Sequence, residues 1–168
     1  MVKEALWKGW TDYTYEVKVT PDLTTKTPAE FIYIAFRYAQ PVGTDRQNFY
    51  TYLMDEANVN GLYIDRFIDG ARTRPVPDTM TFEGAWKNEE KAYNIKLEVT
   101  KDNITGFLDG TQQFTIPDDN LVDGRIGLGV WGADARFDDL KVLGPAGPTA
   151  VDSAGKLATT WSKIKAKF

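Results

Sequence analysis

Residues 93–99, with the sequence YNIKLEV, alternate strictly between apolar and polar side chains, and this stretch decides the fold class. Successive side chains of a β-strand point to opposite faces of a sheet, so strict alternation predicts a strand with one buried face. A second run, Ile104–Leu108, is followed by Asp109-Gly110, a dipeptide typical of two-residue hairpin turns. Residues 112–116 then form the expected return strand, so the segment predicts antiparallel β-sheet.

The same kind of pattern extends in both directions from this segment. Residues 13–20, YTYEVKVT, repeat the alternation upstream, whereas residues 31–38, FIYIAFRY, are apolar on both faces and predict a central strand. Many short strands with turn residues and little helix between them are typical of a sandwich of two sheets. We therefore expect an all-β fold, a two-sheet antiparallel β-sandwich of the jelly-roll type, over residues 1–143. Further strands are expected at residues 48–54, 61–67, 79–82, 125–131 and 136–142.

The composition is that of a soluble globular protein of 168 residues, with 42% hydrophobic and 26% charged residues. The formal net charge of −4 argues against non-specific nucleic-acid binding, which needs a basic surplus to displace counterions. The chain contains no His and no Cys, which excludes Ser-His-Asp and Cys-His hydrolysis, zinc sites with His or thiolate ligands, and disulfides. No run approaches the roughly 20 apolar residues of a membrane span, and no signal peptide is visible after Met1.

The C-terminal segment differs in composition from the rest of the chain. Residues 144–154, beginning GPAGP, predict a linker, and residues 155–168 predict a short, basic, amphipathic helix with one apolar stripe. We expect this helix to dock on its own sandwich or on a protein partner, including a second copy of the chain; binding to an anionic membrane surface is the third option. The docking residues would be Leu157, Trp161, Ile164 and Phe168.

Four segments of the C-terminal half carry a family pattern: YNIKLEV at 93–99, FLDG at 107–110, GRIGLGVW at 124–131 and RFDDLKV at 136–142. Together they resemble concanavalin A-like lectin/glucanase domains, in particular the laminin-G-like and 3-keto-disaccharide hydrolase-like modules of bacterial surface proteins. The resemblance covers roughly residues 10–143, more loosely in the first half. It implies a concanavalin A-like sandwich, a fold that hosts lectins, glycosidases, lyases and adhesion modules alike.

Sugar binding requires aromatic faces that stack on pyranose rings and fixed polar groups that meet the hydroxyls. If the aliphatic residues of the strands at 31–38, 61–67 and 125–131 face the core, the intervening residues lie on the opposite, concave face, where two glycines leave room. Tyr50 and Tyr52 would join this surface only if their strand has the matching register. Alternatively, the aromatic residues only pack, and the Arg and Asp of this set form a cross-strand ion pair. The predicted ligand-binding residues are Tyr33, Arg37, Tyr63, Asp65 and Trp131.

Laminin-G-like sandwiches often bind calcium, so the resemblance also implies a structural calcium ion. Asp138 and Asp139 match the family's F-D-D position on the last strand, which typically lies beside the first strand; Asp12 is the partner expected there. The alternative is that these are turn carboxylates that bond their own backbone.

Glycosidases of this fold need paired carboxylates. Related glucanases place an E-x-D-x-x-E pattern on one strand, and the chain contains no such run. We therefore predict a non-catalytic, lectin-like carbohydrate-binding module of a bacterial secreted or surface protein. The alternatives are a structural or adhesion module that assembles through its C-terminal helix, and a glycoside hydrolase that acts on modified disaccharides. The expected location is extracellular or at the cell surface, with the cytoplasm as the alternative.

Overall fold

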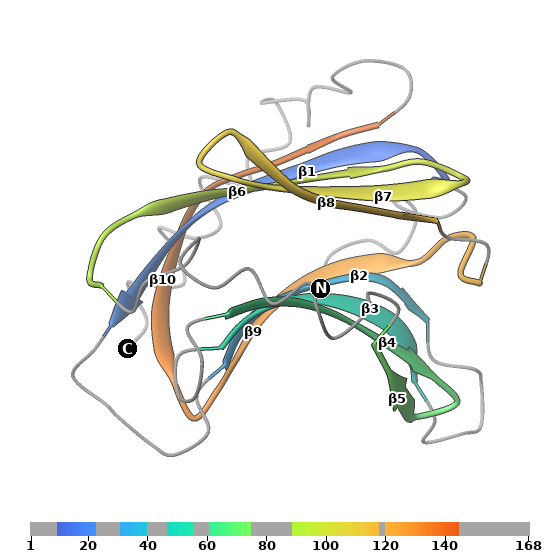
Figure 1. Ribbon diagram of the computed structural model, residues 1–168, viewed down its shortest axis with the longest axis horizontal. Helices are drawn as coiled ribbons and strands as arrows, with labels where there is room; N and C mark the ends of the chain where they lie inside the picture. Colours follow the sequence, from blue (N-terminus) through green and yellow to red (C-terminus); the bar gives the residue numbers. More distant parts are fainter. Residues whose placement is uncertain are drawn as a thin grey trace, which may run out of the picture.

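The computed structural model describes residues 10–22, 31–39, 47–55, 61–74, 89–117 and 120–144, and these residues form strands joined by turns and loops (Figure 1). The expected strand at 79–82, most of the expected linker and the expected helix at 155–168, with Leu157, Trp161, Ile164 and Phe168, lie outside the described residues. The strands are β1 (Tyr13–Asp22), β2 (Phe31–Ala39), β3 (Asn48–Asp55), β4 (Gly61–Ile68), β5 (Ala71–Thr73), β6 (Tyr93–Val99), β7 (Asn103–Leu108), β8 (Thr111–Pro117), β9 (Arg125–Trp131) and β10 (Asp134–Leu143).

The strands form two antiparallel sheets that pack face to face. The first sheet has the order β10-β1-β6-β7-β8, and the second sheet has the order β5-β4-β3-β2-β9. Figure 1 shows the second sheet arched, with its hollow side turned away from the first sheet. The two-sheet antiparallel sandwich predicted from the sequence is therefore confirmed. No helix in the described part of the chain is long and apolar enough to cross a membrane.

Two of the turns follow directly from Asp-Gly dipeptides. Asp109-Gly110 joins β7 to β8, and Asp69-Gly70 joins β4 to β5. Both residues of each pair have positive φ, between 48° and 80°, which is the conformation of a type I′ turn. Glycine accepts this conformation without steric cost, and aspartate tolerates it better than most residues. The hairpin predicted at Asp109-Gly110 is thus confirmed.

The core lies between the two sheets and is built by the predicted alternation. Every second residue of β1 and β6 is buried, and so is every second residue of β2, β3 and β4 over most of their length. Because each buried side chain is followed by one on the outer face, the core fixes which residues the outer faces carry. The first sheet contributes Tyr13, Tyr15, Val17, Val19, Tyr93, Ile95, Leu97 and Val99, and the second contributes Ile32, Ile34, Phe36, Tyr50, Tyr52, Met54, Leu62 and Ile64.

Alternation fails at one residue of β2. Arg37 has a φ of 50°, and the pairing register of β2 shifts around it with both β3 and β9, as in a β-bulge. Its side chain is 0% exposed, and its guanidinium donates hydrogen bonds to the backbone carbonyls of Thr11, Thr100 and Leu121. The prediction that Arg37 lies on the ligand-binding face with Tyr33 is therefore wrong, because the bulge turns Arg37 inward.

Replacing Arg37 should destabilise the sandwich strongly. Arg37→Met removes a buried charged donor that bonds three backbone carbonyl groups, and we expect the free energy of unfolding to fall by about 3 kcal/mol or more. Urea denaturation measures the loss. The matched control is Arg136→Met, since the Arg136 side chain is 66% exposed, and its effect should stay within about 0.5 kcal/mol. Equal effects of the two substitutions would contradict the structural role of Arg37.

Candidate functional site

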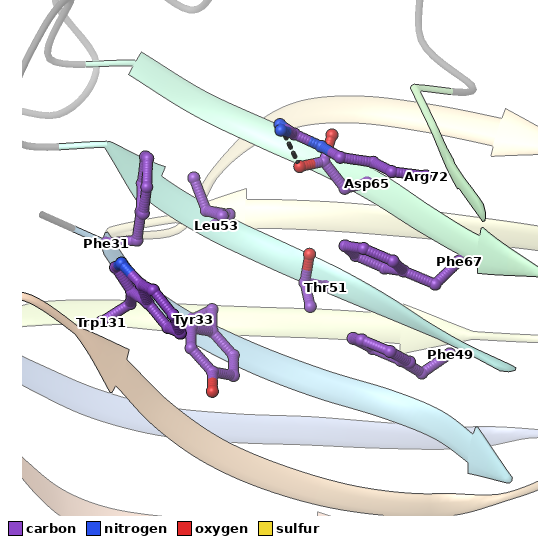
Figure 2. A pocket seen from close by; sticks show the side chains of 9 residues that line it. All are labelled: Phe31, Tyr33, Phe49, Thr51, Leu53, Asp65, Phe67, Arg72 and Trp131. Atoms are coloured by element: carbon purple, nitrogen blue, oxygen red, sulfur yellow. Dashed lines mark ion pairs between the residues drawn. The ribbon is translucent and has the colours of Figure 1, made fainter. Parts of the chain in front are cut away.

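A groove with a volume of about 350 Å³ lies on the outer face of the second sheet. Its walls come from all five strands of that sheet, so it crosses the strands rather than following one of them. Figure 2 shows the side chains that line it. The described lining residues are Phe31, Tyr33, Phe49, Thr51, Leu53, Asp65, Phe67, Arg72 and Trp131.

One side of the groove is an aromatic cluster of Phe31, Tyr33 and Trp131. Phe31 pairs directly with Trp131 across β2 and β9, which brings the two side chains together on one face. Figure 2 shows all three rings gathered at this side. The groove is open to solvent at Trp131, which is 68% exposed. An indole that is so far from buried contributes little to the core, and a large exposed apolar side chain beside a groove is typical of a binding site.

The ring of Tyr33 lies across the backbone of β9. Tyr33 pairs with Gly129, and a Cβ built at Gly129 would clash with the phenol ring. At Gly127 on the same face, a Cβ would meet only the Cβ of Ala35, at 3.9 Å. The space that the sequence predicted at the two glycines is thus open at Gly127, while at Gly129 it is filled by Tyr33. Gly129 lets the ring lie flat against the sheet, next to Trp131.

The middle of the groove combines a stacked aromatic pair with a buried hydroxyl. Phe49 and Phe67 stack with their ring centroids 4.4 Å apart and their planes 6° apart. Thr51, next to them on β3, is 4% exposed, and its Oγ1 has no hydrogen-bond partner among the described residues. A buried hydroxyl without a partner costs about 1–3 kcal/mol, so this atom is suited to a hydrogen bond with a ligand or with water.

The far side of the groove carries charge. Asp65 is 1% exposed and pairs with two arginines: its Oδ1 accepts a hydrogen bond from Arg74 Nε at 3.1 Å, and its Oδ2 forms an ion pair with Arg72 Nη2 at 2.6 Å. The Arg74 guanidinium also lies over the ring of Tyr63, 4.0 Å from its centroid. A buried carboxylate is stable only when it is paired, and two guanidinium groups meet this requirement here.

The structure brings together three of the five predicted ligand-binding residues in the groove. Tyr33, Asp65 and Trp131 line it, and Tyr63 lies on the same face but is covered by Arg74. Arg37 is buried and bonds the carbonyls of Thr11, Thr100 and Leu121, so it forms no ion pair with Asp65. Asp65 pairs with Arg72 and Arg74 instead.

Six lining residues were missed by the sequence prediction. Tyr50 and Tyr52 face the core, so their neighbours on β3 face the groove. Phe31 could have been found by extending the alternation of β2 from Tyr33 by one step. Phe67 could have been found in the same way by extending the alternation of β4 from Asp65. Phe49, Thr51 and Leu53 depend on the register of β3, and Arg72 depends on the pairing of β5 with β4. The missed residues are Phe31, Phe49, Thr51, Leu53, Phe67 and Arg72.

The residues expected to bind calcium do not come together. β10 does pair with β1, but Asp138 lies opposite Lys18, six residues from Asp12. Six residues of strand span roughly 20 Å, so the predicted set of Asp12, Asp138 and Asp139 cannot share one ion. Asp139 instead forms an ion pair with Lys18, with Nζ and Oδ2 2.6 Å apart. Among the described residues there is no group of three or more His, Cys, Asp or Glu side chains that could hold a metal ion.

Asp12 bonds a distant backbone group rather than its own turn, so the alternative interpretation does not describe it either. Its Oδ2 accepts a hydrogen bond from the Thr11 hydroxyl at 2.6 Å, and its Oδ1 accepts one from the backbone N–H of Lys101 at 3.0 Å. These two bonds, with a smaller contribution from the charge of Arg37, lower the pKa of Asp12 below its usual value.

No family model matches the sequence, and no curated protein matches it. Among solved structures, the chain is similar to the carbohydrate-binding module CBM66 from Bacillus subtilis, with a TM-score of 0.59 and 23% identity over 79% of this chain and 74% of that chain. It is also similar to sheep galectin-11 in complex with glycerol (TM-score 0.53, 9% identity, 79% and 90% of the two chains). Chicken galectin 2 gives a TM-score of 0.52 at 12% identity, over 80% and 93% of the two chains. The chain thus shares a two-sheet β-sandwich fold with these proteins.

The contact between Tyr33 and Gly129 can be tested by NMR. We expect the α-proton signals of Gly129 to be displaced by the ring current of Tyr33, and Tyr33→Leu should remove this displacement. Gly127 is the control, because its open position is not under a ring. If Tyr33→Leu leaves the α-proton signals of both glycines unchanged, the ring does not lie across β9.

The role of Asp12 predicts a pH-dependent loss of stability. A carboxyl group whose pKa is lowered by folding stabilises the protein above its unfolded pKa of about 3.9, and this contribution is lost as the pH falls through the folded pKa. Asp12→Ala should therefore lower the free energy of unfolding more at about pH 6 than at about pH 2.5. Urea denaturation at the two pH values measures the difference. A loss that grows toward acid pH would contradict the assigned hydrogen bonds.

Proposed function

We propose that the protein is a non-catalytic carbohydrate-binding module and that its ligand occupies the groove on the second sheet. The observation that carries the proposal is the exposed indole of Trp131, which lies beside Tyr33 and Phe31 in a groove whose far side is polar. This arrangement combines an apolar ring surface with fixed hydrogen-bonding groups in one concave site.

The chemistry of the groove suits a sugar better than a purely apolar ligand. Pyranose rings have apolar faces that pack on aromatic side chains, and hydroxyls that require donors and acceptors. Trp131 and Tyr33 offer the ring surfaces, while Thr51, Asp65 and Arg72 offer polar groups. The unpartnered Thr51 hydroxyl gains a hydrogen bond when a hydroxylated ligand is bound.

The similar solved structures support the proposal. One is a carbohydrate-binding module by name, and another is a galectin in complex with glycerol, a polyol. The outer face of the second sheet is also the hollow face of this fold in the present chain (Figure 1). A carbohydrate-binding module acts where polysaccharides are accessible, so we further propose an extracellular or cell-surface location.

The described residues of the groove support glycoside hydrolysis less well than sugar binding. A glycosidase requires two carboxyl groups about 5–10 Å apart. Among the described residues that line the groove, Asp65 is the one carboxylate, and both of its oxygens are bonded to arginines. The binding of a sugar without cleavage is the function that this geometry favours.

Polysaccharide arrays followed by titration calorimetry test the proposed function. Trp131→Ala should weaken binding of the best ligand at least about tenfold, since a central aromatic anchor typically contributes about 2 kcal/mol or more. The matched control is Phe107→Ala, which removes a half-buried ring from the outer face of the first sheet. Absence of binding across neutral and acidic polysaccharides would refute the proposed function. Equal losses in the two variants would place the site elsewhere.

A further inference from the structure

We propose that the groove is specific for an acidic oligosaccharide and that Arg72 binds a carboxylate group of the sugar. The inference rests on the proposed function and specifies its ligand class. It follows from the charge balance, the donors and the width of the groove.

The charges on the far side of the groove do not balance. Asp65 is buried, and its two oxygens are bonded to two different guanidinium groups, those of Arg72 and Arg74. Among the described residues of this side, one negative charge therefore faces two positive charges. A surplus positive charge beside the low-dielectric interior attracts an anion more strongly than the same charge in open water does.

The surplus extends along the hairpin of β4 and β5. Residues 65–74 contain three arginines and two aspartates, although the whole chain has a formal net charge of −4. This edge of the groove is thus a basic region on an acidic protein. An acidic ligand that is repelled by most of the molecule would be attracted here.

The geometry of Arg72 leaves it accessible to a ligand. Its Nη2 contacts Asp65, yet the Arg72 side chain is 53% exposed, and it lines the groove. A guanidinium presents five N–H donors in a planar fork, which fits the two oxygens of a carboxylate. Arg72 can therefore bind a second carboxylate without releasing Asp65 (Figure 2).

Donors outnumber available acceptors among the described side chains that line the groove. Arg72 and the Trp131 indole N–H can only donate, and the hydroxyls of Tyr33 and Thr51 can do either. The strong acceptor, Asp65, is already bonded to arginines. A carboxylate brings acceptor oxygens alone, so it complements this set better than a neutral sugar, whose hydroxyls also need acceptors.

The width of the groove points to a chain of sugars rather than a single ring. From β9, which carries Trp131, to β5, which carries Arg72, there are four strand spacings. At ~4.8 Å each, they span roughly 19 Å. A ligand that stacks on Trp131 and reaches Arg72 therefore carries its stacked ring and its carboxylate on different sugar residues.

Matched pairs of oligosaccharides test the proposal. Oligogalacturonate, oligomannuronate and hyaluronan fragments are each compared with the same sugars after methyl esterification of the carboxylates, by calorimetry with the full chain. At least one acid form should bind about tenfold or more tighter than its ester. Dextran sulfate and dextran form a further arm, which separates sulfate from carboxylate recognition.

Two arginine variants separate a direct contact from general attraction. Arg72→Gln should remove the preference for the acid form. Arg66→Gln should keep it, since Arg66 alternates with Asp65 on β4 and bonds Thr73 instead of lining the groove. Both variants lose one positive charge from the same hairpin. Arg72→Lys, which keeps the charge without the planar fork, should lie between Arg72→Gln and the unchanged protein.

The outcomes distinguish this inference from the proposed function. If esters bind as tightly as acids, and Arg72→Gln binds as tightly as the unchanged chain, the inference fails while the carbohydrate-binding function stands. If only dextran sulfate binds, the carboxylate is the wrong anion. Equal losses in Arg72→Gln and Arg66→Gln would show general attraction and refute the contact. If no sugar binds, acidic or neutral, the proposed function itself fails.

Discussion

The buried guanidinium of Arg37 is the interaction on which the arrangement of the sandwich depends. It bonds to backbone carbonyls from three separate places: Thr11 ahead of β1, Thr100 after β6, and Leu121 ahead of β9. Thr11 and Thr100 flank strands of the first sheet, and Leu121 precedes a strand of the second sheet. A buried charge is costly unless it is hydrogen-bonded, so the bonds from Nη1 and Nη2 hold the three segments in a fixed relation at one end of the sandwich.

The bulge that turns Arg37 inward also sets the outer face of β2. Phe36 and Arg37 are both buried, and the alternation resumes one residue later, at Tyr38. Tyr38 then lies against Phe49, with ring centroids 5.7 Å apart, on the face that carries the groove. A regular strand would place Arg37 there and direct Tyr38 toward the core. The bulge thus gives this end of the face a ring where the regular pattern predicts a charge, which is consistent with the frequent occurrence of bulges beside functional sites.

Local pattern and cross-strand register explain what the sequence could and could not predict. The alternation within β2, β4 and β9 was sufficient to assign Tyr33, Asp65 and Trp131 to the outer face, because a buried apolar neighbour fixes the direction of each. The predicted position of Arg37 was wrong because nothing in the sequence FIYIAFRY marks the extra residue of a bulge. The prediction that Asp12, Asp138 and Asp139 lie together was wrong for a different reason. The adjacency of β1 and β10 was anticipated correctly, but the register that sets Asp138 opposite Lys18 depends on contacts between distant segments.

The two outer faces of the sandwich differ in a way that the fold does not require. On the first sheet, charged and hydroxyl side chains pair with each other, as in Lys18–Asp139, Lys96–Glu98 and Thr105–Thr115. This is the usual solution for a sheet face in water. The outer face of the second sheet carries Phe31, Tyr33, Phe49, Leu53, Phe67 and Trp131 instead.

These side chains lie outside the core, which is already filled by the inward residues of both sheets. Their exposed surface gives no stability that a polar face would lack, and it raises the risk of aggregation. An apolar surface with this cost is explained when a ligand covers it. The same reasoning applies to Asp65. Burial of a carboxylate with two arginines costs free energy and is not needed to complete the sheet, but it positions a guanidinium beside the proposed ligand.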